Sequence, residues 1–167
     1  MAVLPILRWP DPRLATRCDP VPADEDNAAL IGAMFETMYD APGRGLAAPQ
    51  VGVMKRLFVM DVTWKEGEKS PEVMINPRIL DRSEEITSGE EGCLSIPGVL
   101  TEIERPARVE MAWTDAHGVA QRRWLDGAAA RCAQHEYDHL DGVVTFDRLT
   151  PEGREQAIRR FEGATAQ

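Results

Sequence analysis

Cysteine and histidine are scarce in this chain of 167 residues, which has three of each, and only 6% of its residues are aromatic. An odd number of cysteines argues against a disulfide framework and favours a reducing compartment, so we expect a cytoplasmic protein. No apolar run comes near the roughly 20 residues that a membrane-spanning helix needs, so no membrane association is expected. The opening stretch MAVLPILRWPDPRL lacks the basic start of a signal peptide and is interrupted by Pro5 and Pro10.

Basic residues are fewer than acidic ones, with 19 Lys and Arg against 28 Asp and Glu, which gives a net charge of −9. No local basic run offsets this charge, so direct binding of nucleic acid is not expected. The hydrophobic fraction of 43% is ordinary for a globular protein. Because no repeat or linker divides a chain of this length, we expect a single domain over residues 1–167.

Helical and strand patterns alternate along the chain. Helical patterns occupy three segments: residues 24–40, the stretch from Asp126 to Gly142, and the stretch that starts at Pro151. Strand patterns occupy three others: residues 56–62, 73–80 (interrupted by Pro77) and 109–113. Many short strands around one buried helix indicate an α+β fold.

The segment RCAQHEYDHLDG, residues 131–142, holds two of the three histidines. His135 and His139 are four residues apart, so on a helix both imidazoles lie on one face. Glu136 follows the first histidine and completes the pattern H-E-x-x-H, typical of metal-binding helices with a glutamate that handles protons. A catalytic metal site usually takes three protein ligands and keeps one position open, so a third ligand must come from elsewhere.

Zinc peptidases complete such a site in two ways. One branch has a third histidine six residues after the second, where this chain has Thr145. Another branch takes a glutamate from a later helix, for which Glu155 and Glu162 are available. A peptidase acting on internal peptide bonds therefore stays open at this point. His117 lies in the turn DAHG, where an exposed residue is the ordinary expectation.

Cysteine is the other candidate, because thiolate binds zinc and ferrous iron well. Cys132 precedes His139 by seven residues, about 10.5 Å along a helix, which is too far for one ion that also binds His135. We expect Cys132 to be a small buried residue. Cys18 has no supporting pattern. Cys93 lies in the glycine-flanked segment EEGCLSIPG, and spacing alone leaves it open between a metal ligand and an ordinary core residue.

Three segments together resemble the motifs of peptide deformylases in order and spacing: GRGLAAPQ (43–50), EGCLS (91–95) and QHEYDH (134–139). Each motif alone is weak, but the three in one short chain are very specific. The resemblance implies an α+β fold with antiparallel strands packed around a central metal-binding helix, flanked by N-terminal and C-terminal helices. It also implies a metal-dependent amidohydrolase that removes the N-formyl group from the formyl-methionine of nascent polypeptides and releases formate.

The resemblance assigns the metal ligands to Cys93, His135 and His139. The family uses one ferrous ion per chain and accepts zinc, nickel or cobalt. Glu136 matches the general base and acid that takes a proton from water and delivers it to the leaving amine. The side-chain amide of Gln50 and the backbone N–H of Leu94 match the donors to the oxyanion. For Gln50, the residues alone favour a solvent-facing loop amide.

The resemblance also points to the substrate-binding segment. Gly43, Arg44 and Gly45 match a strand edge along which the substrate backbone pairs, and glycine there avoids collisions with the peptide. Glu91 and Arg105 match positions that form an ion pair behind the metal ligands; the alternative is two solvated charges.

This chain departs from the family pattern at several places. Position 44 is commonly apolar, and Arg44 leads us to expect a preference for acidic residues soon after the methionine. Ala128 and Ala129 are small where the methionine pocket is expected, and Thr145 replaces a bulky apolar residue. Residues 151–167 balance three arginines against three glutamates, so we expect only weak or transient contact with the ribosome. A relative that binds formyl-methionyl peptides without hydrolysing them is the non-enzyme alternative.

Overall fold

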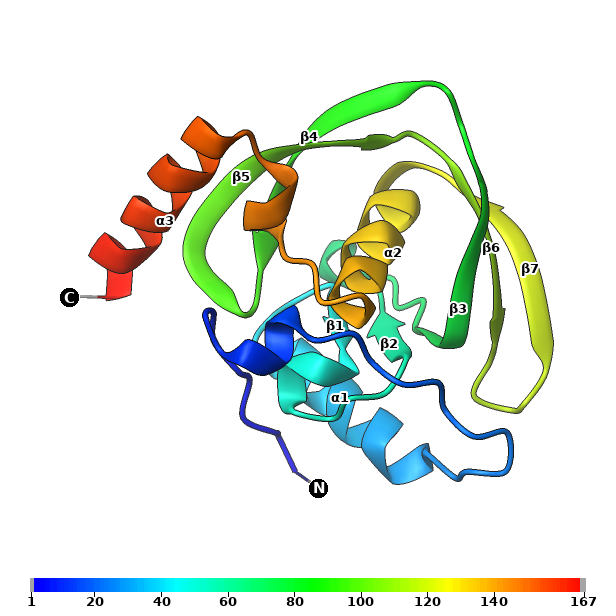
Figure 1. Cartoon of the computed structure of the whole chain (residues 1–167). Helices are drawn as coiled ribbons and strands as arrows, with labels where there is room; N and C mark the ends of the chain where they lie inside the picture. The colour runs from blue at the N-terminus through cyan, green and yellow to red at the C-terminus, as the bar shows by residue number, and fades with distance from the viewer. Residues whose placement is uncertain (1, 166–167) are drawn as a thin grey trace.

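The computed structural model describes residues 2–165, so both ends of the predicted domain 1–167 lie outside the described residues. It contains three α-helices: α1 (Ala28–Asp40), α2 (Gly127–Leu140) and α3 (Pro151–Thr165). Short 3₁₀ helices lie before and between them: η1 (Pro12–Ala15), η2 (Ala48–Val51), η3 (Trp64–Glu66) and η4 (Thr145–Arg148). Figure 1 shows α2 in the middle of the molecule with strands around it and α3 outside β5. Among residues 2–165, no helix is long and apolar enough to cross a membrane.

Within the described residues, seven strands form two antiparallel sheets. The larger has the order β1-β2-β3-β6-β7, with the bounds Gly45–Ala47, Leu57–Met60, Glu72–Arg82, Val109–Thr114 and Ala120–Leu125. The smaller is a long hairpin of β4 (Ile86–Cys93) and β5 (Ile96–Pro106). Antiparallel strands around a central helix, with one helix near each end of the chain, confirm the predicted α+β class.

The uniformly apolar strand β2 is explained by helices on both of its faces. Phe58 and Met60 belong to the core that contains the small residues Ala130 and Ala133 of α2, which let the helix approach the sheet closely. The alternate residues Leu57 and Val59 belong to the core formed with α1. Because side chains alternate across a strand, four consecutive buried apolar residues need cover on both sides.

A third apolar cluster attaches α3 to the hairpin. Trp9, Phe146 and Phe161 pack edge to face, with ring centroids 5.0 to 6.2 Å apart. Ile96 and Val99 of β5 belong to the same cluster. Aromatic edge-to-face pairs of this kind add to the stabilisation from burial alone. The hairpin end that carries Cys93 is therefore held from the outside as well as by α2.

Element boundaries differ from the sequence prediction in places. The helix predicted over residues 24–40 begins at Ala28, whose backbone N–H donates to the Asp26 carboxylate at 2.9 Å. The acidic residues before it therefore precede the helix instead of forming its first turn. Asp126 does occupy the position before α2, but its side chain makes no capping hydrogen bond. The pairing of β3 with β6 shifts register between Ile75 and Arg78, around the proline expected to interrupt the strand.

Candidate metal centre

Three potential ligands converge on one point from two elements. Cys93 ends β4, and His135 and His139 lie one turn apart on α2. One ligand atom from each lies within 4.8 Å of the others, and the Cys93 Sγ is 3.4 Å from the His139 Nε2. Bonds of about 2.0–2.3 Å from one ion place its tetrahedral ligands roughly at that spacing. The three buried residues therefore fit a divalent metal ion, and this geometry favours the metal-ligand alternative for Cys93 over an ordinary core residue.

The two histidines differ in the surroundings of their Nδ1 atoms. His135 is oriented by Glu91, whose carboxylate oxygen lies 3.0 Å from its Nδ1, which leaves Nε2 for an ion. The Nδ1 of His139 is buried and has no partner among the described residues. Burial, followed by the nearby His135, lowers the pKa of His139 well below its usual value. A neutral His139 is the form that can act as a ligand.

Glu136 is placed beside the three ligands with one oxygen free. Its side chain is buried, and among the described residues its Oε1 has no hydrogen-bond partner. Its Oε2 lies 3.9 Å from the Nε2 of His135. Burial raises the pKa of the Glu136 carboxyl to about 7. A carboxyl group that titrates near neutrality is suited to accept a proton and return it.

Gln50 is buried, with 1% of its surface exposed, so the solvent-facing alternative for this residue is wrong. Its carbonyl oxygen accepts from the backbone N–H of Ala47 at 2.9 Å. Its amide nitrogen donates to the Ser95 Oγ at 3.0 Å and lies 3.7 Å from the Cys93 Sγ. The amide is thus held with its donor end toward the metal ligands. Leu94 follows Cys93 in the turn between β4 and β5, and its side chain lines the adjoining cleft.

A cleft of about 1110 Å³ opens between the segment 43–45, the hairpin and α2, and Cys93, His135 and Glu136 line it. Gly45 begins β1, an edge strand of the large sheet, and Gly43 precedes it. A Cβ on Gly45 would come within 2.6 Å of the Glu136 Oε2 and 2.8 Å of the Cys132 Sγ. A Cβ on Gly43 would come within 2.7 Å of the Leu94 side chain. A side chain at position 45 would force the Glu136 carboxylate and the Cys132 thiol to shift, whereas at position 43 only the Leu94 side chain would have to move.

Arg44 lies at the cleft with nearly half of its side chain exposed, and it pairs with the exposed Glu66 at 3.3 Å. Its carbonyl accepts from the backbone N–H of Asp61 at 2.8 Å, on the side of β2. That carbonyl is thus already used within the sheet. Both backbone groups of Gly43 are used as well, because its N–H donates to the Met38 carbonyl and its carbonyl accepts from the Trp64 side chain. Pairing with a peptide then depends on the remaining backbone groups of Arg44 and Gly45.

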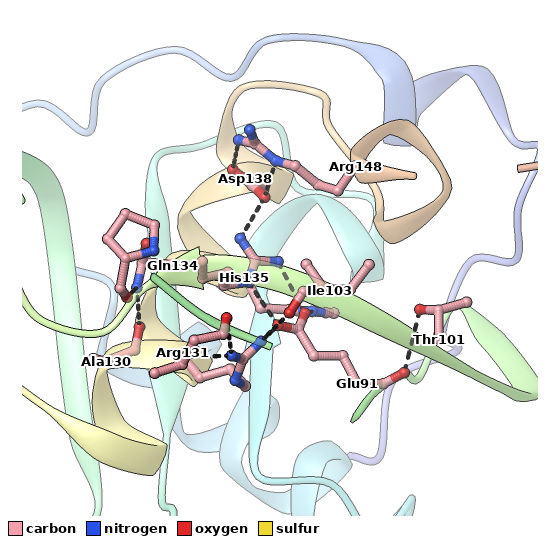
Figure 2. A network of polar contacts seen from close by, with 12 residues as sticks. Glu91, Thr101, Ile103, Ala130, Arg131, Gln134, His135, Asp138 and Arg148 are labelled. Carbon is pink, nitrogen blue, oxygen red and sulfur yellow. Dashed lines mark hydrogen bonds and ion pairs between the residues drawn. The ribbon is translucent and has the colours of Figure 1, made fainter. Parts of the chain in front are cut away.

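A chain of buried ion pairs runs behind the ligands (Figure 2). Arg105 donates to Glu91 through two nitrogens at 2.6 and 2.9 Å and to Asp138 at 3.0 Å. Asp138 in turn accepts two bonds from Arg148 on η4. Burial favours the neutral form of Glu91, but the bonds from Arg105 and His135 outweigh it and hold its pKa at about 2. The ion pair expected between Glu91 and Arg105 is present, and the alternative of two solvated charges is wrong.

Arg131 is a residue of this network that the sequence analysis missed. Its Nη1 donates to the second oxygen of Glu91 at 2.7 Å (Figure 2). The available signal was its position four residues before His135, which places it on the same face of α2. Its partners on β4 and β5 could not be inferred from that spacing.

The remaining candidates lie away from the three ligands. His117 is exposed in its turn, as expected, and Glu155 and Glu162 are exposed on α3. Cys132 packs against the core around α2 but is only partly buried and also lines the cleft, so it is less buried than expected. Ala128 also lines the cleft. Ala129, which was expected at the same pocket, is absent from the described lining, and Thr145 is buried.

The polypeptide deformylase family matches residues 3–155. Among individual relatives, the peptide deformylase of Rhizobium meliloti is 47% identical over 165 residues, which covers 98% of this chain and 95% of that protein. The peptide deformylase of Rhizorhabdus wittichii is 47% identical over 170 residues, with 98% and 96% covered.

Solved structures agree with the sequence match. A peptide deformylase from Legionella pneumophila superimposes with a TM-score of 0.91 at 39% identity, covering 99% of this chain and 96% of that one. The peptide deformylase from Ehrlichia chaffeensis in complex with actinonin gives a TM-score of 0.91 at 40% identity, with both chains fully covered. With its three motifs, its fold and its buried group of one cysteine and two histidines, the chain belongs to the polypeptide deformylase family.

Proposed function

We propose that this protein hydrolyses the N-formyl group of formyl-methionine at the N-terminus of newly made polypeptides and releases formate. The observation that carries the proposal is the buried group of Cys93, His135 and His139 with a free oxygen of Glu136 beside it. Membership of the deformylase family supports the same activity. The peptidase alternative lacks its third ligand, because Glu155 and Glu162 are exposed on α3.

We propose that Cys93, His135 and His139 hold one ferrous ion, which zinc, nickel or cobalt can replace. One thiolate with two imidazoles is a donor set that suits these metals. When bound, such an ion polarises the formyl carbonyl and makes water a competent nucleophile near neutral pH. The unpartnered Nδ1 of His139 and the carboxylate on the Nδ1 of His135 leave both Nε2 atoms available as ligands.

In this proposal Glu136 moves the proton. Its free Oε1 accepts a proton from the attacking water and returns it to the amine that leaves. A pKa near 7 makes both transfers accessible at neutral pH. Burial keeps bulk water away from the carboxyl, so the proton stays with the reacting groups.

Gln50 and Leu94 are proposed as the donors to the oxyanion that forms on the formyl group. The carbonyl of Gln50 is fixed by the N–H of Ala47, so its amide nitrogen is oriented before the substrate arrives. Fixed donors cost no reorganisation during the reaction, and removal of one typically costs about 2.7–4 kcal/mol of transition-state stabilisation. The second donor, the backbone N–H of Leu94, lies in the tight turn beside Cys93. Because it belongs to the backbone, every substitution of Leu94 except proline keeps it.

The substrate is proposed to lie along the edge of β1, with its formyl group at the three ligands. Gly43 and Gly45 leave room for a peptide backbone there. We expect the protein to act in the cytoplasm, where formyl-methionyl chains are made and a thiolate ligand stays reduced. Contact with the ribosome is proposed to be transient, because the net charge of −9 opposes stable binding to RNA.

The test is formate release from formyl-Met-Ala-Ser by iron-loaded protein under anaerobic conditions. Acetyl-Met-Ala-Ser serves as the matched substrate, because it keeps the peptide and adds one methyl group at the reacting carbon. We expect turnover of the formyl peptide and none of the acetyl peptide. Cleavage of internal peptide bonds would instead support a peptidase, and tight binding of the formyl peptide without formate release would support the binding-only alternative.

A further inference from the structure

The segment 43–45, along which the substrate is proposed to lie, has little rigidity of its own. Two of its three residues are glycines, and Pro42 precedes them. Glycine has more backbone freedom than any other residue, so a glycine-rich strand edge keeps one shape only when other groups hold it. The contacts that hold this segment therefore decide whether the edge is formed before a peptide arrives.

One loop supplies two of these contacts. The loop, residues 61–70, follows β2 and contains η3. The backbone N–H of Asp61 donates to the Arg44 carbonyl at 2.8 Å, next to the pairing of β1 with β2. The indole N–H of Trp64 donates to the Gly43 carbonyl at 2.8 Å. The first bond comes from the backbone, whereas the second depends on the side chain at position 64.

The indole of Trp64 is itself held in place. It packs edge to face against the Tyr39 ring on α1, with ring centroids 5.2 Å apart. The buried carboxylate of Asp61 accepts from the Tyr39 hydroxyl at 2.6 Å and from the backbone N–H of Ser70 at 3.1 Å. Both ends of the loop are thus tied together and to α1, so the indole donor has a fixed position relative to the segment 43–45.

Trp64 lies behind the cleft and does not face it. Among the described residues, the lining of the cleft includes Val62 and Lys65 of this loop but not Trp64. The indole is half-buried and packs against the core formed with α1. Its bond to Gly43 can therefore act on a substrate only through the segment 43–45.

We propose that Trp64 is a positioning residue for the substrate. Its indole N–H fixes the Gly43 carbonyl and thereby holds the strand edge in the shape that pairs with a peptide backbone. The inference rests on the proposed deformylase activity. Trp64 takes no part in the reaction at the formyl group, so loss of its donor should weaken the binding of the peptide and leave the chemical step unchanged.

The experiment removes the indole donor but keeps an aromatic ring, in Trp64→Phe. Trp124→Phe is the matched control, because Trp124 is exposed on β7, at the opposite edge of the sheet from β1. Each iron-loaded variant is assayed with formyl-Met-Ala-Ser and with formyl-methioninamide, which has the same reacting group and first side chain but no peptide beyond them. The ratio of the two kcat/KM values cancels any general loss of activity or of metal.

The net contribution of one hydrogen bond typically shifts an equilibrium by roughly 2- to 13-fold. We therefore expect Trp64→Phe to raise KM for formyl-Met-Ala-Ser about 3- to 10-fold, with kcat within about two-fold of wild type. The kcat/KM ratio of the peptide to the amide should fall in this variant and stay at the wild-type value in Trp124→Phe. An unchanged ratio in Trp64→Phe, or an equal fall in both variants, would overturn the proposal.

Amide hydrogen exchange tests the same positioning without turnover. In the metal-loaded protein without substrate, the segment 43–45 should exchange at least about three-fold faster in Trp64→Phe than in wild type, while β2 and α1 change little. Equal acceleration in all three segments would show a general loss of stability and would overturn the proposal. If the exchange changes as expected but the wild-type protein releases no formate from formyl-Met peptides, the proposed activity on which the inference rests is refuted.

Discussion

Replacing Glu91 with glutamine is the most informative single change behind the proposed metal ligands. The substitution keeps the shape of the side chain and removes its charge. Glu91 accepts from His135 at 3.0 Å, from Arg105 at 2.6 and 2.9 Å, and from Arg131 at 2.7 Å. Glutamine can accept through only one oxygen, so at least one arginine nitrogen loses its acceptor on this side chain.

Two effects of Glu91→Gln can be sized separately. Loss of a carboxylate that orients a histidine ligand typically lowers metal affinity about 10- to 100-fold, or roughly 1.4–2.7 kcal/mol. Removal of one partner from a buried ion pair typically costs about 3–5 kcal/mol of folding stability. Arg105 keeps Asp138, and Arg131 keeps Ile103 and Thr87. We therefore expect a loss of about 3 kcal/mol, which a domain stable by about 5–15 kcal/mol survives.

The assay pairs Glu91→Gln with Glu90→Gln. Glu90 is the preceding residue on β4, is exposed, and undergoes the same change in charge and shape. Zinc affinity is measured by competition with a chromophoric chelator, and stability by urea unfolding of the metal-free protein. Equal affinities and equal unfolding midpoints in the two variants would show that Glu91 neither orients His135 nor stabilises the core.

Three further outcomes are expected. Cys93→Ala should lose most bound metal while Cys132→Ala retains it, as measured by mass spectrometry of the native protein; equal retention would reject Cys93 as a ligand. Glu136→Ala should fold and bind metal but lose about 10²- to 10⁴-fold in turnover, and near-normal formate release would assign the proton transfer to another group. For formyl-Met peptides, Asp or Glu soon after the methionine should raise kcat/KM no more than several-fold over Lys at low salt, because Arg44 is exposed and already paired with Glu66. This preference for acidic residues should vanish in Arg44→Ile and grow in Glu66→Gln. The same preference in both variants as in the wild type would exclude Arg44 as its source.

The sequence predicted those features of the fold and site that depend only on the spacing of nearby residues. The two histidines on one face of α2 follow from their separation of four residues, and the start of α3 follows from Thr150 and Pro151. Cys93 needed the resemblance of its segment to a family motif, because a single cysteine on a strand has no periodic signal. The first helix was placed too early, because acidic residues favour both a first turn and the residues before it.

Contacts between distant parts of the chain could not be predicted in the same way. The spacing from His135 places Arg131 on the ligand face of α2, but its partners Glu91 and Thr87 lie 40 and 44 residues away and have no local signal. β1 is only three residues long and is preceded by a loop rich in glycine and proline, so its strand character depends on pairing with β2. The partial exposure of Cys132 likewise follows from the placement of Gly45, whose missing Cβ leaves space above the thiol.

Within residues 2–165, the β4–β5 hairpin forms a sheet of its own, with no backbone ladder to the five-stranded sheet. Cys93 ends the first strand of this hairpin, and its partner His139 lies 46 residues further along the chain. An ion held by both would act as a removable crosslink that closes a long chain loop. Amide hydrogen exchange in β4 and β5 should therefore slow when metal is added, while exchange in β2 changes little. The hairpin would be the first part of the molecule to open when the ion leaves, and a protease should cut it there before the sheet.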